Sequence, residues 1–141
     1  MNTTTNLKDM ENHLPLKKIL YVDDDLQSRL LVKHLIGKHY HLTLVSNAKE
    51  ALEVLQNQVF DLILLDIRLE GEMSGIDLLK KIQQMPWHYG APVIAVTAFA
   101  FEEDKRFLLS SGFTDYVSKP IDLQYFKEIV YEYTENNQVL Q

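Results

Sequence analysis

The stretch KILYVDDD, residues 18–25, joins a short apolar run directly to three adjacent aspartates. A continuously apolar run such as Ile19 to Val22 is typical of a strand that is buried on both faces of a parallel sheet. Adjacent carboxylates repel one another, and none gains from lying beside apolar surface. Taken alone, the three aspartates predict either a solvated turn with a helix N-cap or a cation site.

Similar apolar runs recur along the chain and alternate with amphipathic segments. The predicted strands are residues 18–22, 42–45, 62–65, 93–96 and 116–118. The predicted helices contain or span residues 31–36, 48–56, 75–84, 102–111 and 123–133. An Asn47–Glu50 capping box is predicted to begin the second of these helices, and Gly37 and Gly112 are predicted to end the first and the fourth. In the last two helices, Phe107 and Leu123 are among the apolar positions. This order predicts an α/β domain with a doubly wound, five-stranded parallel sheet.

Length and composition limit the possible functions of the chain. A chain of 141 residues fits one domain, with flexible tails expected at 1–15 and 137–141 and the domain at 16–136. The net charge of -6 argues against direct nucleic-acid binding, which needs clustered lysine and arginine. No stretch is apolar enough for a membrane span or a signal peptide, and there is no cysteine, so we expect a soluble, cytoplasmic protein.

Polar residues follow four of the five predicted strands. They are Asp23 to Asp25, then Asp66, Thr97 and Lys119. Ligands of open α/β sheets bind beyond the carboxyl ends of the strands, so these side chains are expected at one edge. Carboxylates suit a hard cation such as Mg²⁺, whereas a hydroxyl and an ammonium suit a phosphoryl group. The set predicts phosphoryl transfer to a carboxylate nucleophile.

Four motifs together resemble the receiver domain of two-component response regulators. They are VDDD, DLILLDIRLEGEMSG, PVIAVTA and YVSKP, which occur in the family's order over about residues 17–135. The resemblance implies a flavodoxin-like receiver fold with strand order 2-1-3-4-5. It also implies a domain that is either a stand-alone receiver or part of a longer regulator or hybrid kinase.

The resemblance implies a role for each matching position. Asp66 corresponds to the phosphoacceptor. The metal site corresponds to Asp23, Asp24, Asp66 and the backbone carbonyl of Arg68, with Asp24 the more direct ligand of the acidic pair. Thr97 and Lys119 correspond to the contacts of the phosphoryl oxygens, and Tyr116 to a switch aromatic. Pro120 matches a Lys-Pro dipeptide whose peptide bond is usually cis, and Asp25 is left to support the first turn of the helix.

The implied function is phosphoryl acceptance in a phosphorelay, with Mg²⁺ as the cofactor and Mn²⁺ as the alternative. The implied donor is a sensor histidine kinase or a histidine phosphotransfer protein. Phosphorylation would change a surface formed by the fourth helix, fifth strand and fifth helix, with Phe107, Tyr116 and Tyr125 as candidate contacts, and this face is also a candidate homodimer interface. Such a domain assists its own phosphorylation and dephosphorylation but is not an enzyme in the usual sense. Phe99 is a candidate shield of the phosphoryl group.

The loop after Asp66 departs from the family's pattern. A proline usually lies four residues after the phosphoacceptor, where this chain has Glu70. The glycine expected near the end of the loop is Gly75, which comes one residue late. Glu70 and Glu72 also add negative charge near a site that must accept a phosphoryl group.

Three other classes of protein fit the sequence less well. An aspartyl phosphohydrolase would resemble Asp-x-Asp-x-Thr after the first strand, but Asp25 is followed by Leu26 and Gln27. Intact Asp66, Thr97 and Lys119 argue against a degenerate adaptor, and the absence of a Ser/Thr/Gly-rich loop argues against a flavodoxin-like cofactor carrier. The three histidines at 34, 39 and 41 are expected on an outer helix face and turn, away from the strand ends.

Overall fold

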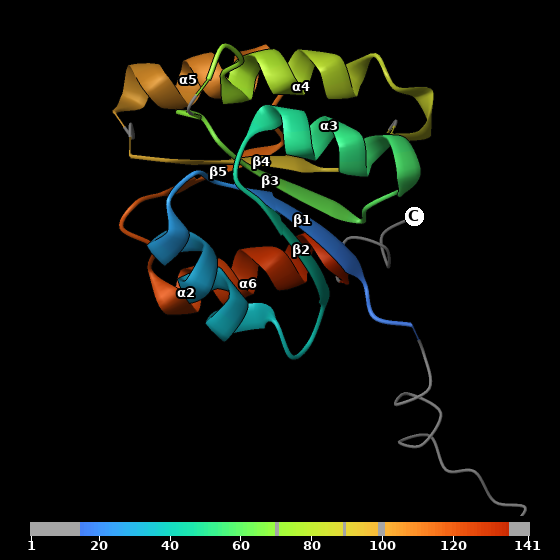
Figure 1. Ribbon diagram of the computed structural model, residues 1–141. Helices are drawn as coiled ribbons and strands as arrows, with labels where there is room; N and C mark the ends of the chain where they lie inside the picture. The colour runs from blue at the N-terminus through green and yellow to red at the C-terminus, as the bar shows by residue number, and fades with distance from the viewer. Residues whose placement is uncertain (1–14, 70, 89, 99–100, 136–141) are drawn as a thin grey trace, which may run out of the picture.

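The structure is a computed structural model, and it describes residues 15–69, 71–88, 90–98 and 101–135. These residues form one parallel sheet in the order β2-β1-β3-β4-β5 (Figure 1). The strands are β1 (Lys18–Val22), β2 (His41–Val45), β3 (Leu62–Asp66), β4 (Val93–Thr97) and β5 (Asp115–Ser118). This is the predicted doubly wound fold with the predicted strand order. The expected tails at 1–15 and 137–141 lie outside the described residues, apart from Pro15.

Helices cover both faces of the sheet (Figure 1). They are α2 (Leu26–Ile36), α3 (Ala48–Asn57), α4 (Gly75–Gln83), α5 (Glu102–Ser111) and α6 (Leu123–Thr134), with a short 3-10 helix, η1, at Pro86–His88. Helices α3, α4 and α5 lie on one face, and α2 and α6 lie on the other. Within the described residues, no helix has the length and apolar character needed to cross a membrane.

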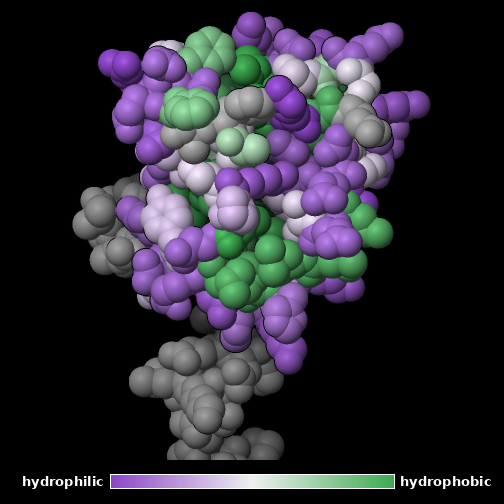
Figure 2. Space-filling view, turned by 90° about the vertical axis from the view of Figure 1, so that its left-hand side faces the viewer, coloured by the Kyte–Doolittle hydropathy of each residue, from purple (hydrophilic) through white to green (hydrophobic). Residues whose placement is uncertain are grey.

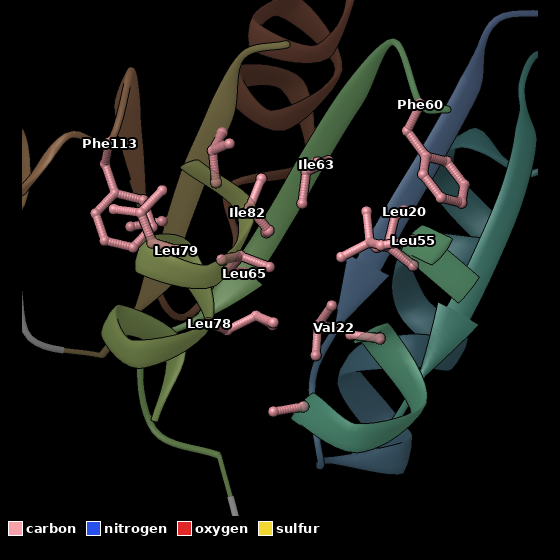
Figure 3. Packing of buried hydrophobic residues seen from close by; sticks show 14 of the residues in the cluster. Leu20, Val22, Leu55, Phe60, Ile63, Leu65, Leu78, Leu79, Ile82 and Phe113 are labelled. Carbon is pink, nitrogen blue, oxygen red and sulfur yellow. The ribbon is translucent and has the colours of Figure 1, made fainter. Parts of the chain in front are cut away.

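Two separate hydrophobic cores result from this layering, because successive side chains of a strand point to opposite faces of the sheet. Leu20 and Val22 of β1 lie beneath α3 and α4, where Leu20 lies beside Leu55, and the same cluster extends to Leu79 and Phe113 (Figure 3). Tyr21, the residue between them, is fully buried in the core on the α2 and α6 side. Strands that supply both cores must be apolar throughout, which accounts for the continuous runs in the sequence.

Polar side chains begin the helices that follow the strands near the site. Asp25 is the N-cap of α2, and its carboxylate accepts hydrogen bonds from the Ser28 N–H (3.2 Å) and hydroxyl (2.7 Å). The predicted support of the first turn of the helix by Asp25 is therefore confirmed. Asn47 caps α3 as predicted, since its Oδ1 accepts from the N–H of Glu50 (2.8 Å). The predicted capping box is only half formed, because Glu50 accepts from the side-chain amide of Asn47 (3.0 Å) and not from its backbone N–H.

The register of the strands brings their carboxyl ends to one edge. Val22 pairs with Leu65, so Asp23 and Asp66 follow at the same level of neighbouring strands. Asp66 pairs with Val96, and Thr97 pairs with Ser118. The residues that continue β1, β3, β4 and β5 therefore meet at this edge.

Candidate functional site

Three carboxylates meet where β1 and β3 end. Asp23, Asp24 and Asp66 each offer one oxygen atom, and these three atoms lie within 4.8 Å of one another. Asp23 is fully buried and Asp66 is only 6% exposed, while Asp24 is half-buried. Because like charges at this spacing repel one another strongly, the group favours a cation.

Lys119 extends from the end of β5 into this group. Its Nζ lies 2.8 Å from Oδ2 of Asp23 and 3.3 Å from Oδ2 of Asp66. The N–H of Lys119 donates to the carbonyl of Thr97 (2.8 Å), which holds the backbone of the lysine against β4. The Lys119–Pro120 peptide bond is cis, as the resemblance implied. The ammonium group of Lys119 therefore contacts two of the predicted carboxylates.

Asp23 is fixed by contacts that the sequence did not suggest. The hydroxyl of Tyr21 donates to its Oδ2, and the N–H of Asp25 donates to its Oδ1 at 2.9 Å. Arg29, one turn into α2, donates from Nη1 to the carbonyl of Asp23 at 2.6 Å. Tyr21 precedes Asp23 by two residues, and that spacing places both side chains on one face of a strand, so the i, i+2 pair was the available signal.

The electrostatics of the group show in its pKa values. Burial, reinforced by the neighbouring charge of Asp23, raises the pKa of Asp66 from 3.8 to about 6. Burial alone would lower the pKa of Lys119. The hydrogen bond to Asp23 and the negative charge of Asp66 together have the larger effect, so the pKa of Lys119 is raised. Burial and the bond to Asp23 raise the pKa of Tyr21 far above its usual range, so its hydroxyl keeps its proton. At neutral pH the site thus holds an ammonium ion among carboxylates.

Two glycines shape the loop that follows Asp66. Gly71 adopts a φ of 106°, a conformation that other residues rarely take. Gly75, the first residue of α4, passes so close to β3 that an added Cβ would lie 2.2 Å from the carbonyl oxygen of Asp66. Gly75 also donates its N–H to the carbonyl of Ile67 (3.0 Å), so the loop closes tightly beside Asp66. Glu70 lies outside the described residues, and Glu72 is exposed.

The remaining predicted residues have different surroundings. The N–H of Arg68 donates to Oδ1 of Asp66 at 3.1 Å, which places its peptide beside the carboxylate group. Thr97 is buried at the end of β4. Tyr116 is half-buried against the core on the α3 to α5 face, and the Nζ of Lys105 lies 5.2 Å from the centroid of its ring.

Several residues considered in the sequence lie away from the carboxylate group. His34, His39 and His41 are all exposed, and none belongs to the group of three carboxylates. Phe107 of α5 and Tyr125 of α6 are exposed as well, at 55% and 45%. Phe99, the expected shield of the phosphoryl group, lies outside the described residues.

The donor atoms of the group fit a small, hard cation. Carboxylate oxygens are the ligands preferred by Mg²⁺, which keeps several of its waters and therefore needs few protein ligands. Asp23 and Asp66 are also the two residues that Lys119 contacts, so an ammonium lies directly beside the carboxylate group. Such a site can hold an anion with several oxygens between an ammonium and a metal ion.

The chain belongs to the response regulator receiver domain family, whose pattern matches residues 19–131. It is a receiver domain of two-component signalling with the flavodoxin-like receiver fold.

Individual relatives place this domain in different settings. The "Uncharacterized 14.6 kDa protein in sodA1 3′region" of Leptolyngbya boryana is 37% identical over 116 residues, which are 82% of this chain and 88% of that protein. The transcriptional regulatory protein ZraR of Escherichia coli is 38% identical over 105 residues, 74% of this chain but 23% of ZraR. The signal transduction histidine-protein kinase BarA of Escherichia coli is 34% identical over 116 residues, 82% of this chain but 12% of BarA.

Solved structures agree with the fold. The chemotaxis response regulator CheY4 of Vibrio cholerae matches with a TM-score of 0.78 at 24% identity, over 84% of this chain and 98% of that one. The receiver domain of sensor histidine kinase PA1611 of Pseudomonas aeruginosa, which has a magnesium ion coordinated in its active site cleft, matches with a TM-score of 0.76 at 27% identity, over 84% and 97%. The receiver domain of Saccharomyces cerevisiae Ssk1, in complex with the histidine phosphotransfer protein Ypd1, matches with a TM-score of 0.75 at 26% identity, over 85% and 90%.

Proposed function

We propose that Asp66 accepts a phosphoryl group from a phosphohistidine of a sensor histidine kinase or a histidine phosphotransfer protein. The observation that carries this proposal is the position of Asp66 between two further carboxylates and the ammonium of Lys119. In the transfer, the P–N bond of the donor breaks and a P–O bond to an oxygen of Asp66 forms. Relatives of two-component signalling, BarA and the Ypd1–Ssk1 complex among them, support this class of donor.

Each neighbour of Asp66 has a part in this transfer. A carboxyl with a pKa of about 6 is largely ionised at neutral pH, so Asp66 is available as the nucleophile. Lys119 already lies 3.3 Å from Asp66 and can neutralise charge on the oxygens of the incoming group. Thr97, at the end of the adjacent strand β4, is the hydroxyl that we assign to another of these oxygens.

We assign a Mg²⁺ site, which Mn²⁺ can also fill, to Asp23, Asp24, Asp66 and the backbone carbonyl of Arg68. The three carboxylate oxygens within 4.8 Å of one another support this assignment. The N–H of Arg68 donates to Oδ1 of Asp66 (3.1 Å), so the backbone of Arg68 passes close to the carboxylate group. When bound, the ion would neutralise charge on the transferring group and on the carboxylates around it.

We further propose that phosphorylation changes the face formed by α5, β5 and α6. The phosphoryl group carries about two negative charges at neutral pH in place of the single charge of the Asp66 carboxylate, and it presents three acceptor oxygens beside Thr97. Movement of the Thr97 hydroxyl toward them would leave space that Tyr116 can enter by turning inward, and Tyr116 already packs partly against the core. The exposed aromatic rings of Phe107 and Tyr125 make this face the candidate surface for output partners or for a homodimer.

The chemical proposal is tested with a small phosphodonor. The protein is incubated with Mg²⁺ and acetyl phosphate, and intact-mass spectra are expected to show the addition of one phosphoryl group. Asp66→Asn keeps the shape of the side chain but removes the nucleophile, so this variant should gain none. Asp25→Asn is the matched control, because Asp25 caps α2 and should leave phosphorylation unchanged. Phosphorylation of Asp66→Asn at the wild-type level would overturn the assignment.

A further inference from the structure

Strand β2 forms one edge of the sheet and has a neighbour on one side only. The N–H of His41 donates to Lys17 (2.9 Å), and the carbonyl of Val45 accepts from Asp23 (3.1 Å), so these residues direct their backbone groups toward β1. Because successive residues of a strand alternate in direction, Leu42 and Leu44 direct their N–H and C=O groups outward from the sheet. Such an edge is a template for another strand.

A groove of about 590 Å³ runs beside this edge, between β2 and α2. Its apolar surface comes from Leu30, Leu42 and Leu44, and Leu30 remains 53% exposed. Leu26, one turn before Leu30 on α2, is 57% exposed and extends the exposed apolar surface beside the groove. Figure 2 shows a continuous hydrophobic area on the lower half of this side of the molecule, where α2 lies. An apolar surface of this kind indicates an interaction site.

The charged side chains around the groove are basic, although the whole chain carries a net charge of -6. Lys33, His34 and Lys38 line the groove, and none of its described lining residues is acidic. Lys33 and Lys38 are both exposed. An occupant with carboxylates therefore has complementary charge here, whereas the negative charge of the chain as a whole disfavours an anionic membrane.

We infer that the edge of β2 binds an extended, acidic segment of a partner protein, which adds a strand to the sheet. Backbone hydrogen bonds to Leu42 and Leu44 would hold the segment, and alternate side chains would fall over the groove. Apolar side chains would cover Leu30, and acidic ones would reach Lys33 and Lys38. A strand is favoured over a helix because only an extended segment can form a ladder of hydrogen bonds with the outward backbone groups of β2. This inference does not depend on the phosphoacceptor role of Asp66.

Selection from a phage-displayed library of random 16-residue peptides on the full chain tests the inference. The enriched peptides should carry apolar and acidic residues at every second position, which are the positions that face the groove. Binding of a synthetic copy of an enriched peptide should fall about tenfold or more in Lys33→Glu/Lys38→Glu, because like charges then face each other. It should be unchanged in Lys80→Glu/Lys81→Glu, which makes the same change in net charge at exposed positions of α4.

Hydrogen exchange then separates strand addition from other modes of binding. The bound peptide should slow exchange of the Leu42 and Leu44 amides, and both variant proteins should keep the thermal stability of the wild type. Failure to enrich peptides, enrichment with a spacing of three to four residues, or unchanged exchange at Leu42 and Leu44 would overturn the inference. Binding to phosphatidylserine vesicles that is lost in Lys33→Glu/Lys38→Glu, or concentration-dependent dimers sensitive to that change, would overturn it in favour of a membrane or a second copy.

Discussion

Lys119 and Asp23 form the shorter of the two ion pairs at the site, with 2.8 Å between Nζ and Oδ2. The side chain of Asp23 has no exposed surface, whereas that of Lys119 is 21% exposed. Lys119 therefore neutralises a charge that water cannot reach, in addition to its contact with Asp66. We therefore expect Lys119 to contribute to folding as well as to the proposed phosphoryl acceptance.

The first prediction concerns this ion pair. Lys119→Met keeps the apolar stem but leaves buried Asp23 without its countercharge. We expect the free energy of unfolding at pH 7 without divalent cations to fall by about 1–3 kcal/mol, below the cost of a wholly buried pair because Lys119 is partly exposed. Urea unfolding measures the change, with Lys127→Met at an exposed position of α6 as the control. Equal losses in the two variants would contradict the prediction.

The second prediction concerns the cation. Mg²⁺ should bind weakly but raise the melting temperature, because it relieves repulsion among Asp23, Asp24 and Asp66 and binds only the folded state. Asp24→Ala should raise the melting temperature in EDTA and abolish the response to Mg²⁺. Thermal unfolding over a Mg²⁺ titration, repeated with Mn²⁺, checks both statements. A wild-type melting temperature that does not change with Mg²⁺ concentration would count against the assigned metal site.

The third prediction concerns pH. The folded-state pKa of Asp66 is about 6, above its ordinary value of 3.8, so the folded protein holds this proton more tightly than the unfolded chain does. The free energy of unfolding should therefore decrease as pH rises from about 4 to about 6, by about 1–3 kcal/mol from this group in EDTA. Asp66→Asn should lose that part of the pH dependence and be more stable than the wild type at pH 7. If the free energies of unfolding of the two proteins changed in parallel with pH, the prediction would be refuted.

The fourth prediction concerns the loop beside Asp66. Gly75→Ala would place a Cβ 2.2 Å from the Asp66 carbonyl oxygen and 2.9 Å from the Cα of Ile67, and backbone atoms cannot easily move aside. We expect a loss of about 1–3 kcal/mol in stability and slower phosphorylation by acetyl phosphate. Gly71→Ala meets no atom within 4 Å but must adopt a φ of 106°, so it should lose about 1–2 kcal/mol with little effect on phosphorylation. Denaturant unfolding and phosphorylation rates compare the two.

The fifth prediction concerns the proposed switch. Beryllofluoride, which mimics a phosphoryl group on aspartate, should shift NMR signals near Asp66 and also over residues 104–126. Lys105→Met should change the response of Tyr116, since the Lys105 Nζ lies 5.2 Å from the ring centroid. Shifts confined to the surroundings of Asp66 would refute the switch but leave the phosphoacceptor proposal intact.

The sheet was predictable from the sequence because each of its strands is a local apolar run bounded by polar residues. Differences fall at the ends, where β2 begins at His41 and β5 begins at Asp115, one residue earlier than predicted. Pairing with β1 places exposed His41 in the sheet, since its N–H bonds to Lys17 whatever its side chain. Phe107 and Leu123, predicted as apolar stripe positions, are 55% and 51% exposed because they lie near the outer faces of α5 and α6.

The site was predictable only to the level of residue type and strand end. Asp23, Asp66 and Lys119 could be assigned to one edge because parallel strands share a direction, and the structure does bring them together. The i, i+2 spacing of Tyr21 and Asp23 was a signal for their bond, but the bond from Arg29 to the carbonyl of Asp23 depends on a side-chain direction that no periodic pattern specifies. Outside the site, the burial of His88 in η1 was not predicted for the same reason. Its Nε2 lies 2.9 Å from the carbonyl of Leu55, which is 33 residues away in the sequence.

The alternation of side chains between the two cores separates neighbours in the sequence and unites residues that are far apart. Leu20 and Tyr21 share a peptide bond but belong to different cores, whereas Leu20 and Leu55 pack in the same one. In a double-mutant cycle, truncations at Leu20 and Leu55 should therefore be coupled, while truncations at Leu20 and Tyr21 should approach additivity. For the energetics of this domain, the relevant neighbourhood of a residue is its side of the sheet rather than its place along the chain.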